Sequence, residues 1–147
     1  MAKINHQSFQ SLEEARNFYL RSVDRYAGQV RSQFITTEPG QAEVYNMKNQ
    51  QAAQYLQNPG LSENFPWVVS EALARSGEDT PEAMSEAALW ITANADTWSY
   101  GGAKIEQHRM SAKYKIREKT TAREMWIEYN EAINNMESVV QEMLNLL

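Results

Sequence analysis

Apolar residues in the first part of the chain recur every three or four positions, which is the spacing of one face of an α-helix. The members of this stripe are Leu12, Ala15, Tyr19, Val23, Tyr26, Val30 and Phe34. The stripe begins within Ser11-Leu12-Glu13-Glu14, a capping box in which the serine hydroxyl accepts from the backbone N–H at position 14 and Glu14 reaches back. We therefore predict a helix that begins there and continues to about Phe34.

Residues 36–40 interrupt this pattern and predict the start of a second helix. Thr37 suits the N-cap and Pro39 suits the first helical turn, and Asn58-Pro59-Gly60 predicts an end near Gln57. The apolar positions in between are Ala42, Tyr45, Ala52, Tyr55 and Leu56. Because they are sparse, we expect this helix to pack on one side only.

A short helix is predicted over residues 66–76, with Pro66 in its first turn. Gly77 follows in the C′ position, where a left-handed backbone costs glycine little. The residues expected to face inward are Trp67, Val68, Ala72 and Leu73.

Thr80-Pro81-Glu82 restarts the chain, and beyond it the apolar spacing becomes a heptad seam, the pattern of a long packed helix. The seam consists of Met84, Ala88, Ile91, Ala95, Trp98, Gly102, Ile105, Arg109, Ala112 and Ile116. Arg109 is its single charged member and must extend to solvent or meet a carboxylate. Each glycine in Tyr100-Gly101-Gly102 costs a helix about 0.5–1 kcal/mol relative to alanine. We expect a kink there, or two helices in line.

Thr121 and Glu124 form a second capping box, and the apolar stripe after it continues to the last residue. Its members are Trp126, Tyr129, Ile133, Met136, Val140, Met143 and Leu147. The final helix must bury this stripe, either inside the chain or against a neighbour, and its periodicity leaves both open. The residues predicted to form a protein interface are Trp126, Met136, Val140, Met143, Leu144 and Leu147.

These elements predict an all-α fold: an antiparallel bundle of five to six helices, with one long heptad-patterned helix and an apolar C-terminal helix. The length of 147 residues, 42% of them hydrophobic, predicts one domain over 1–147, with residues 1–10 as a possible extended arm. The lack of cysteine excludes disulfides and thiol chemistry. No signal-like or membrane-spanning apolar run is found, so we expect synthesis in the cytoplasm and no membrane.

The titratable residues do not predict an active site. In Glu106-Gln107-His108 the acid and the imidazole are two positions apart and point to different sides of a helix. His6 lies outside the predicted helices, and acid pairs such as Glu82 with Glu86 suit a solvated face. We therefore predict no catalytic, cofactor or metal residues, and no enzyme.

The formal net charge of −5 conceals three blocks of charge. Residues 61–100 hold one base and seven acids, residues 101–124 hold seven bases and three acids, and residues 125–147 hold four acids and no base. The basic block could contact phosphate, but acidic segments flank it, and this favours ion pairs within or between subunits over nucleic acid. The residues predicted to pair are Arg109, Lys113 and Arg117.

Two stretches carry a resemblance to a known family. The first is Asp24-Arg25-x-x-Gly28-x-x-Arg31-x-x-Phe34-Ile35-Thr36-x-x-Pro39-Gly40-Gln41, followed by Tyr45, Lys48, Gln51-Ala52 and Tyr55-Leu56. The second is Phe65-Pro66-Trp67-Val68 with Glu71-Ala72, then Trp98 and Ile105-Glu106-x-x-Arg109-x-x-Ala112-Lys113-x-x-Ile116. Together they cover residues 24–118 and resemble the helical region of tailed-bacteriophage tail-fibre and virion-associated proteins.

The resemblance implies a structural role in a phage particle, without catalysis. It implies other phage structural proteins as partners, several copies or a homo-oligomer, and location in the virion after synthesis in the bacterial host. An alternative is a tail or tail-fibre assembly chaperone that is absent from the mature particle. A third is a nucleic-acid-associated protein that uses residues 104–123.

Overall fold

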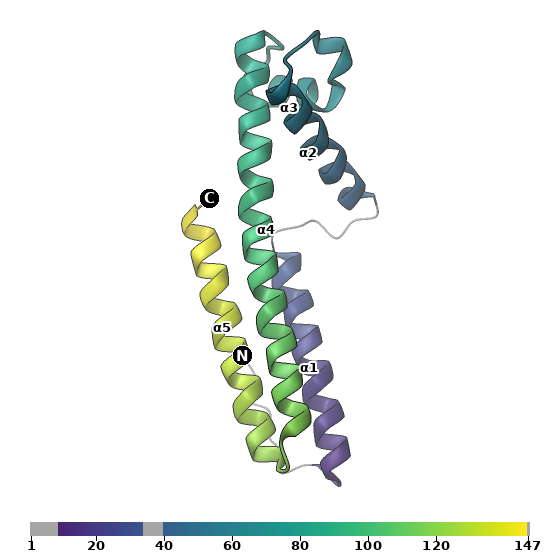
Figure 1. The fold of residues 1–147 in the computed structure, drawn as a ribbon, viewed down its shortest axis with the longest axis vertical. Coiled ribbons are helices and arrows are strands. Elements are labelled where there is room, and N and C mark those ends of the chain that lie inside the picture. The colour runs from purple at the N-terminus through teal and green to yellow at the C-terminus, as the bar shows by residue number, and fades with distance from the viewer. Residues whose placement is uncertain (1–8, 34–39, 147) are drawn as a thin grey trace. The chain divides into compact units, whose positions relative to one another are not determined.

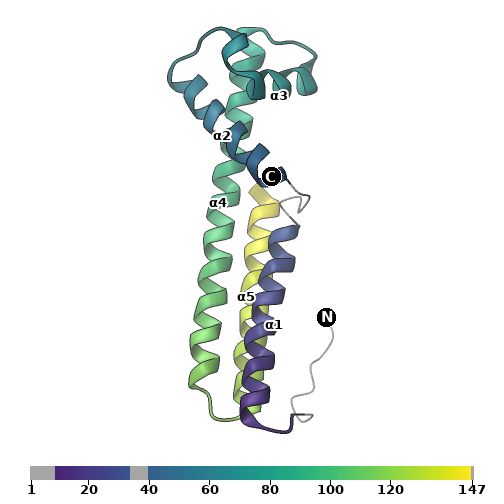
Figure 2. The same ribbon diagram turned by 90° about the vertical axis from the view of Figure 1, so that its right-hand side faces the viewer.

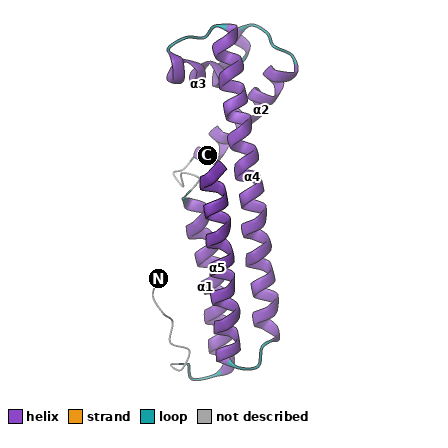
Figure 3. Ribbon diagram, turned by 90° about the vertical axis from the view of Figure 1, so that its left-hand side faces the viewer, coloured by secondary structure: helices purple, strands orange, loops and turns teal. Residues whose placement is uncertain are grey.

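The structure is a computed structural model that describes residues 9–33 and 40–146. Those residues form five α-helices and a short 3-10 helix, and none of them lies in a strand (Figures 1 and 3). The elements are α1 (Leu12–Ser32), α2 (Gln41–Gln57), η2 (Ser62–Asn64), α3 (Pro66–Ser76), α4 (Pro81–Glu118) and α5 (Ala122–Leu146). The prediction of an all-α helical bundle is confirmed.

The chain divides into two compact units. Unit 1 contains α1, α5 and the part of α4 that begins at Tyr100, and unit 2 contains α2, η2, α3 and α4 as far as Ser99. Each unit has its own buried residues and its own polar contacts.

The two predicted capping boxes do start helices. The Ser11 hydroxyl accepts from the Glu14 backbone N–H at 3.0 Å, and the Thr121 hydroxyl accepts from the Glu124 N–H at 3.1 Å. The two glutamate carboxylates do not form the predicted reciprocal bond to the backbone N–H of the capping residue. Glu14 accepts from the backbone N–H of Gln10 at 3.0 Å, and Glu124 accepts from the Thr121 hydroxyl at 2.8 Å.

In unit 2 a glycine stands at the start of α2 and another at the end of α3. Gly40 precedes α2 with a φ of 86° and Gly77 follows α3 with a φ of 75°, both in the left-handed region that glycine adopts without a steric penalty. The end of α3 is therefore as predicted. The proposed cap at Thr37 and the turn at Pro39 lie outside the described residues, as does Phe34.

Of the two alternatives expected at Gly101 and Gly102, the division into two helices is wrong, because α4 stays helical through both glycines. Gly101 is buried, and a Cβ at this position would overlap the Met143 side chain of α5. The glycine therefore permits a close helix approach whose packing offsets its poor helix propensity.

In unit 1, α1 and α5 run parallel and α4 runs antiparallel to both (Figure 2). Tyr19 packs on Tyr129 with ring centroids 5.7 Å apart, and further along both helices the Tyr26 hydroxyl donates to Glu137 at 3.0 Å. The largest fully buried side chains here are Tyr19, Val23, Val30, Ile105, Ile116, Met125, Ile133, Met136 and Met143. All belong to the predicted stripes except Met125, one position before Trp126.

The core of unit 2 is small and rich in alanine. Its buried members are Ala52, Tyr55, Val68, Ala72, Met84, Ala87, Ala88 and Ile91. As predicted, α2 packs on one side only, with Ala52 and Tyr55 as its buried residues. Two polar contacts join α2 to α3: Lys48 pairs with Glu71 at 3.0 Å, and the Gln51 side-chain oxygen accepts from the Trp67 backbone N–H at 2.8 Å.

Leu73 differs from the sequence prediction. Val68 and Ala72 are buried, but the Leu73 side chain is exposed, because it borders an open depression instead of facing another helix.

Candidate functional site

A network of ion pairs joins α1 to α4 in unit 1. Asp24 of α1 accepts from Arg109 at 2.5 Å and from Lys113 at 2.7 Å. Glu106 pairs with Arg109 at 2.7 Å and also with Arg31 of α1. The predicted pairing of Arg109 and Lys113 therefore lies within the chain. Arg109, the charged member of the heptad seam, therefore meets two carboxylates and does not extend to solvent.

The electrostatics of this network keep its carboxylates ionised. The hydrogen bond from Arg109 is the main cause that lowers the pKa of Glu106 to about 2, with partial burial acting against it. For Asp24, partial burial also opposes ionisation, but the bonds from Lys113 and Arg109 outweigh it and lower the pKa. The same bonds, from Glu106 and Asp24, raise the pKa of Arg109. Groups held as permanent ions fasten helices together and are poorly suited to proton transfer near neutral pH.

Arg117 is placed differently from the other two predicted pairing residues. Its guanidinium lies over the Tyr114 ring, 5.8 Å from the centroid. No ion pair of Arg117 is found among residues 9–33 and 40–146. It is exposed.

The outer side of α4 in unit 1 carries a second stripe at three- and four-residue spacing. We call it the α4 stripe, and its members are Tyr100, Ala103, Gln107, Met110 and Tyr114, all exposed. Tyr114 has 58% of its surface exposed. Lys104 lies over the Tyr100 ring at 4.6 Å, and Lys115 and Arg117 follow Tyr114 along the chain. The stripe is an apolar surface beside basic groups.

The sequence prediction missed the α4 stripe because it followed only the seam through Arg109. A signal was present, since Tyr100, Met110 and Tyr114 keep heptad spacing on the side of the helix opposite the seam. Whether such a second stripe is covered depends on how many helices surround α4, which periodicity does not determine.

The predicted interface residues of α5 divide into buried and exposed groups. Met136, Val140 and Met143 are buried within unit 1, where α5 packs against α1. Trp126 is half-buried, Leu144 is 53% exposed, and Leu147 lies outside the described residues. Most of this helix therefore buries its apolar face inside the chain, and the surface left at its end comes from Leu144 and Leu146.

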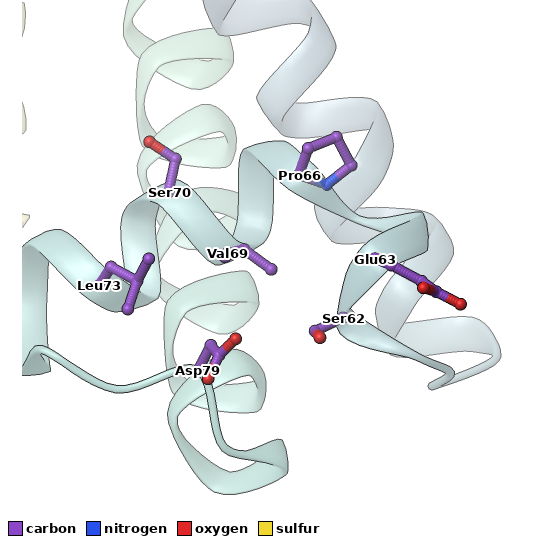
Figure 4. Close-up of a pocket in the computed structure, with 7 residues that line it drawn as sticks. All are labelled: Ser62, Glu63, Pro66, Val69, Ser70, Leu73 and Asp79. Atoms are coloured by element: carbon purple, nitrogen blue, oxygen red, sulfur yellow. The ribbon is translucent and has the colours of Figure 1, made fainter.

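Unit 2 has an open depression of about 520 Å³, which we call the α3 pocket (Figure 4). Its lining residues are Ser62, Glu63, Pro66, Val69, Ser70, Leu73 and Asp79. In Figure 4, Val69 lies centrally, Asp79 points towards the apolar side chains, and Glu63 extends outward from the rim. The pocket thus combines an apolar floor with two carboxylates, and no basic residue lines it.

The surroundings of the α3 pocket are acidic as well. Glu78 and Glu82 flank Asp79 in sequence and both are exposed. The one base in residues 61–100 is Arg75, whose guanidinium lies over the Trp90 ring at 4.6 Å. This surface therefore favours a partner that carries positive charge.

The described residues offer little for metal or acid–base chemistry. No group of three or more His, Asp or Glu among them could hold a metal ion. His108 is half-buried beside the α4 stripe, Glu82 and Glu86 are exposed, and His6 lies outside the described residues. The described residues instead present two apolar surfaces: the α4 stripe, which lies beside basic side chains, and the α3 pocket, which lies beside acidic side chains.

No helix within the described ranges is both long and apolar enough to cross a membrane. Comparison with protein-family models, curated proteins and solved structures finds no match to this chain.

Proposed function

We propose that this protein is a bacteriophage structural protein, attached to the tail or another part of the virion, that acts through protein–protein contacts and carries out no catalysis. Its partners would be other phage structural proteins, and it would be present in several copies. The proposal combines the resemblance over residues 24–118 with the exposed apolar surfaces of both units.

The observation that carries the proposal is that the residues of the resemblance contact one another. Asp24 and Arg31, from its first stretch, form ion pairs with Glu106, Arg109 and Lys113 from its second stretch. These residues are 75 to 89 positions apart in sequence. The residues that carry the resemblance therefore also join α1 to α4 in this chain.

The same holds in unit 2. Lys48 and Gln51 of the first stretch contact Glu71 and Trp67 of the second, through an ion pair and a hydrogen bond to the first turn of α3. This supports a role defined by shape and surface.

Mass spectrometry of purified particles tests the proposal directly. We expect peptides of this chain in particles purified through two successive density gradients, at a constant ratio to the major capsid protein. Lysate from the same infection provides the control for carry-over, because a contaminant would lose that ratio between gradients. Absence from the particles would refute the structural role.

The same measurement distinguishes the structural protein from the second hypothesis, an assembly chaperone. A tail or tail-fibre assembly chaperone would be abundant in infected cells and missing from mature particles. The open apolar floor of the α3 pocket is the surface that would hold its client.

Binding to DNA separates the third hypothesis, a nucleic-acid-associated protein that uses residues 104–123. Phosphate contacts would give an affinity that falls steeply with salt. Because Arg109 and Lys113 are already paired with Asp24 and Glu106, we expect no such binding to double-stranded DNA. Salt-sensitive binding that is lost in Lys115→Glu would favour this third role instead.

A further inference from the structure

We propose that this protein associates with itself head to tail, with the α4 stripe of one copy docked on the α3 pocket of a second copy. The inference deepens the proposed function, on which it rests for its biological setting, by naming the partner as a second copy of this chain. It is tested on the isolated protein, so its outcome is independent of whether particles contain the chain.

Both surfaces expose large apolar side chains that lack cover within their own unit. On the α4 stripe, Met110 and Tyr114 are 40% and 58% exposed and lie one helical turn apart. In the α3 pocket, Leu73 is 47% exposed and stands next to Val69. The depression is open and has a volume of about 520 Å³, so a tyrosine ring can lie against its apolar side chains, and removing these groups from water is favourable.

The charges beside the two surfaces are opposite. Lys115 and Arg117 lie within three residues of Tyr114, and neither forms an ion pair among the described residues. Asp79 points into the α3 pocket, and Glu63 stands at its rim. Lys115 and Arg117 lie on either side of Tyr114 around α4, so a Tyr114 ring placed on the apolar floor would have a cation on each side of it, next to a pocket that carries carboxylates.

A contact between unlike surfaces of two copies suits these charges better than a symmetric contact between like surfaces. Two α4 stripes facing each other would bring the bases of two copies together, and two α3 pockets would do the same with their acids. The opposite pairing joins a segment of net charge −6, residues 61–100, to one of net charge +4, residues 101–124. Each copy carries both surfaces, so the contact is heterologous and can be repeated from copy to copy.

Sedimentation velocity of the full chain tests the proposal. We expect species larger than the monomer between about 1 μM and about 1 mM at low salt, and dissociation at about 500 mM salt, where surface charges are screened. The stripe variant Lys115→Glu/Arg117→Glu and the pocket variant Glu63→Lys/Asp79→Lys should each be monomeric, with self-association at least about tenfold weaker.

Mixing the two variants provides the decisive measurement. The stripe variant keeps an intact pocket and the pocket variant keeps an intact stripe, so an equimolar mixture should associate although each variant alone does not. The two altered surfaces have exchanged charges and are complementary to each other as well, so the mixture should form larger species in addition to dimers. The matched control is Arg21→Glu/Arg123→Glu, which makes the same charge change at exposed positions outside the α4 stripe. It should associate like the unmodified protein, and circular dichroism should show that every variant keeps its helices.

Three results would overturn the proposal. The first is an unmodified protein that stays monomeric at every concentration and salt, which would leave the two surfaces to a different protein. The second is a mixture of the two variants that stays monomeric although the unmodified protein associates. The third is a control variant that dissociates as readily as the stripe variant.

Discussion

Arg109 of α4 and Asp24 of α1, 85 positions apart in sequence, lie 2.5 Å apart and share a network with Glu106 and Lys113. The pair links two helices that lie far apart in the sequence. It also fixes the register of α4 against α1, because Arg109 lies on the seam that packs in unit 1.

Replacing Arg109 by methionine should destabilise the protein by about 0.5–2 kcal/mol, because two carboxylates that are partly screened by solvent lose their shared partner. Urea unfolding followed by circular dichroism measures the change. The matched variant Arg117→Met removes an exposed guanidinium with no ion pair in the described ranges and should cost less than about 0.5 kcal/mol. Equal losses in the two variants would contradict a stabilising role for the network.

Gly101→Ala and Gly102→Ala should have opposite effects. A Cβ at Gly102 meets nothing within 4 Å, so alanine should stabilise the helix by about 0.5–1 kcal/mol. At Gly101 the Cβ overlaps the Met143 side chain, so we expect a loss of about 1–3 kcal/mol. In a Met143→Ala background the loss from Gly101→Ala should shrink, because the obstructing side chain is gone. A loss unchanged in that background would contradict the close approach of α4 and α5.

Stability should fall as the pH is lowered, and Glu106 should contribute to the fall. Its ordinary pKa is 4.5, and the folded protein lowers this pKa to about 2. The stabilisation from its ionised form is therefore present above about pH 4.5 and is lost as the pH falls through about 2. The difference in unfolding free energy between the unmodified protein and Glu106→Gln should be largest near neutral pH and diminish towards pH 2. A difference independent of pH would contradict this account.

Met136→Ala should destabilise the fold by about 2–4 kcal/mol, because the side chain is fully buried within unit 1. Leu144→Ala, at the exposed end of the same helix, should cost less than about 0.5 kcal/mol. Thermal unfolding at two protein concentrations tests the comparison. If the Met136→Ala loss appeared only as dissociation of an oligomer, the residue would belong to a subunit interface instead of the core.

Tyr19→Phe should stabilise the protein by about 1 kcal/mol. Tyr19 is fully buried, its hydroxyl has no hydrogen-bond partner in the described part of the chain, and burial raises its pKa to about 12. Tyr55→Phe is the control, because the Tyr55 hydroxyl donates to the Pro81 carbonyl and its loss should give no gain. Calorimetry distinguishes the two, and a destabilised Tyr19→Phe would indicate that a water molecule satisfies this hydroxyl.

The amino-acid sequence predicted the elements of this fold well where a local signal exists. The capping serine and threonine start α1 and α5, Gly77 ends α3, and the heptad seam correctly assigned Ile105, Ala112 and Ile116 to the core. At Gly101 the alternative of two separate helices was wrong, since a glycine that weakens an isolated helix can strengthen a packed one. The sequence prediction also failed at Leu73, because a helix face predicts burial only if another element covers it.

The candidate surfaces were harder to predict from the sequence than the helices were. Periodicity predicted that Met136 and Met143 face something apolar, and charge blocks predicted that Arg109 meets a carboxylate. The sequence by itself therefore determined the helices, their apolar stripes and the distribution of charge, because each depends on residues a few positions apart. Only the tertiary structure decided that Arg109 meets Asp24, that α5 is buried within the chain, and that the α4 stripe and the α3 pocket remain open. These features depend on which helices become neighbours, and that is set by packing between residues distant in sequence.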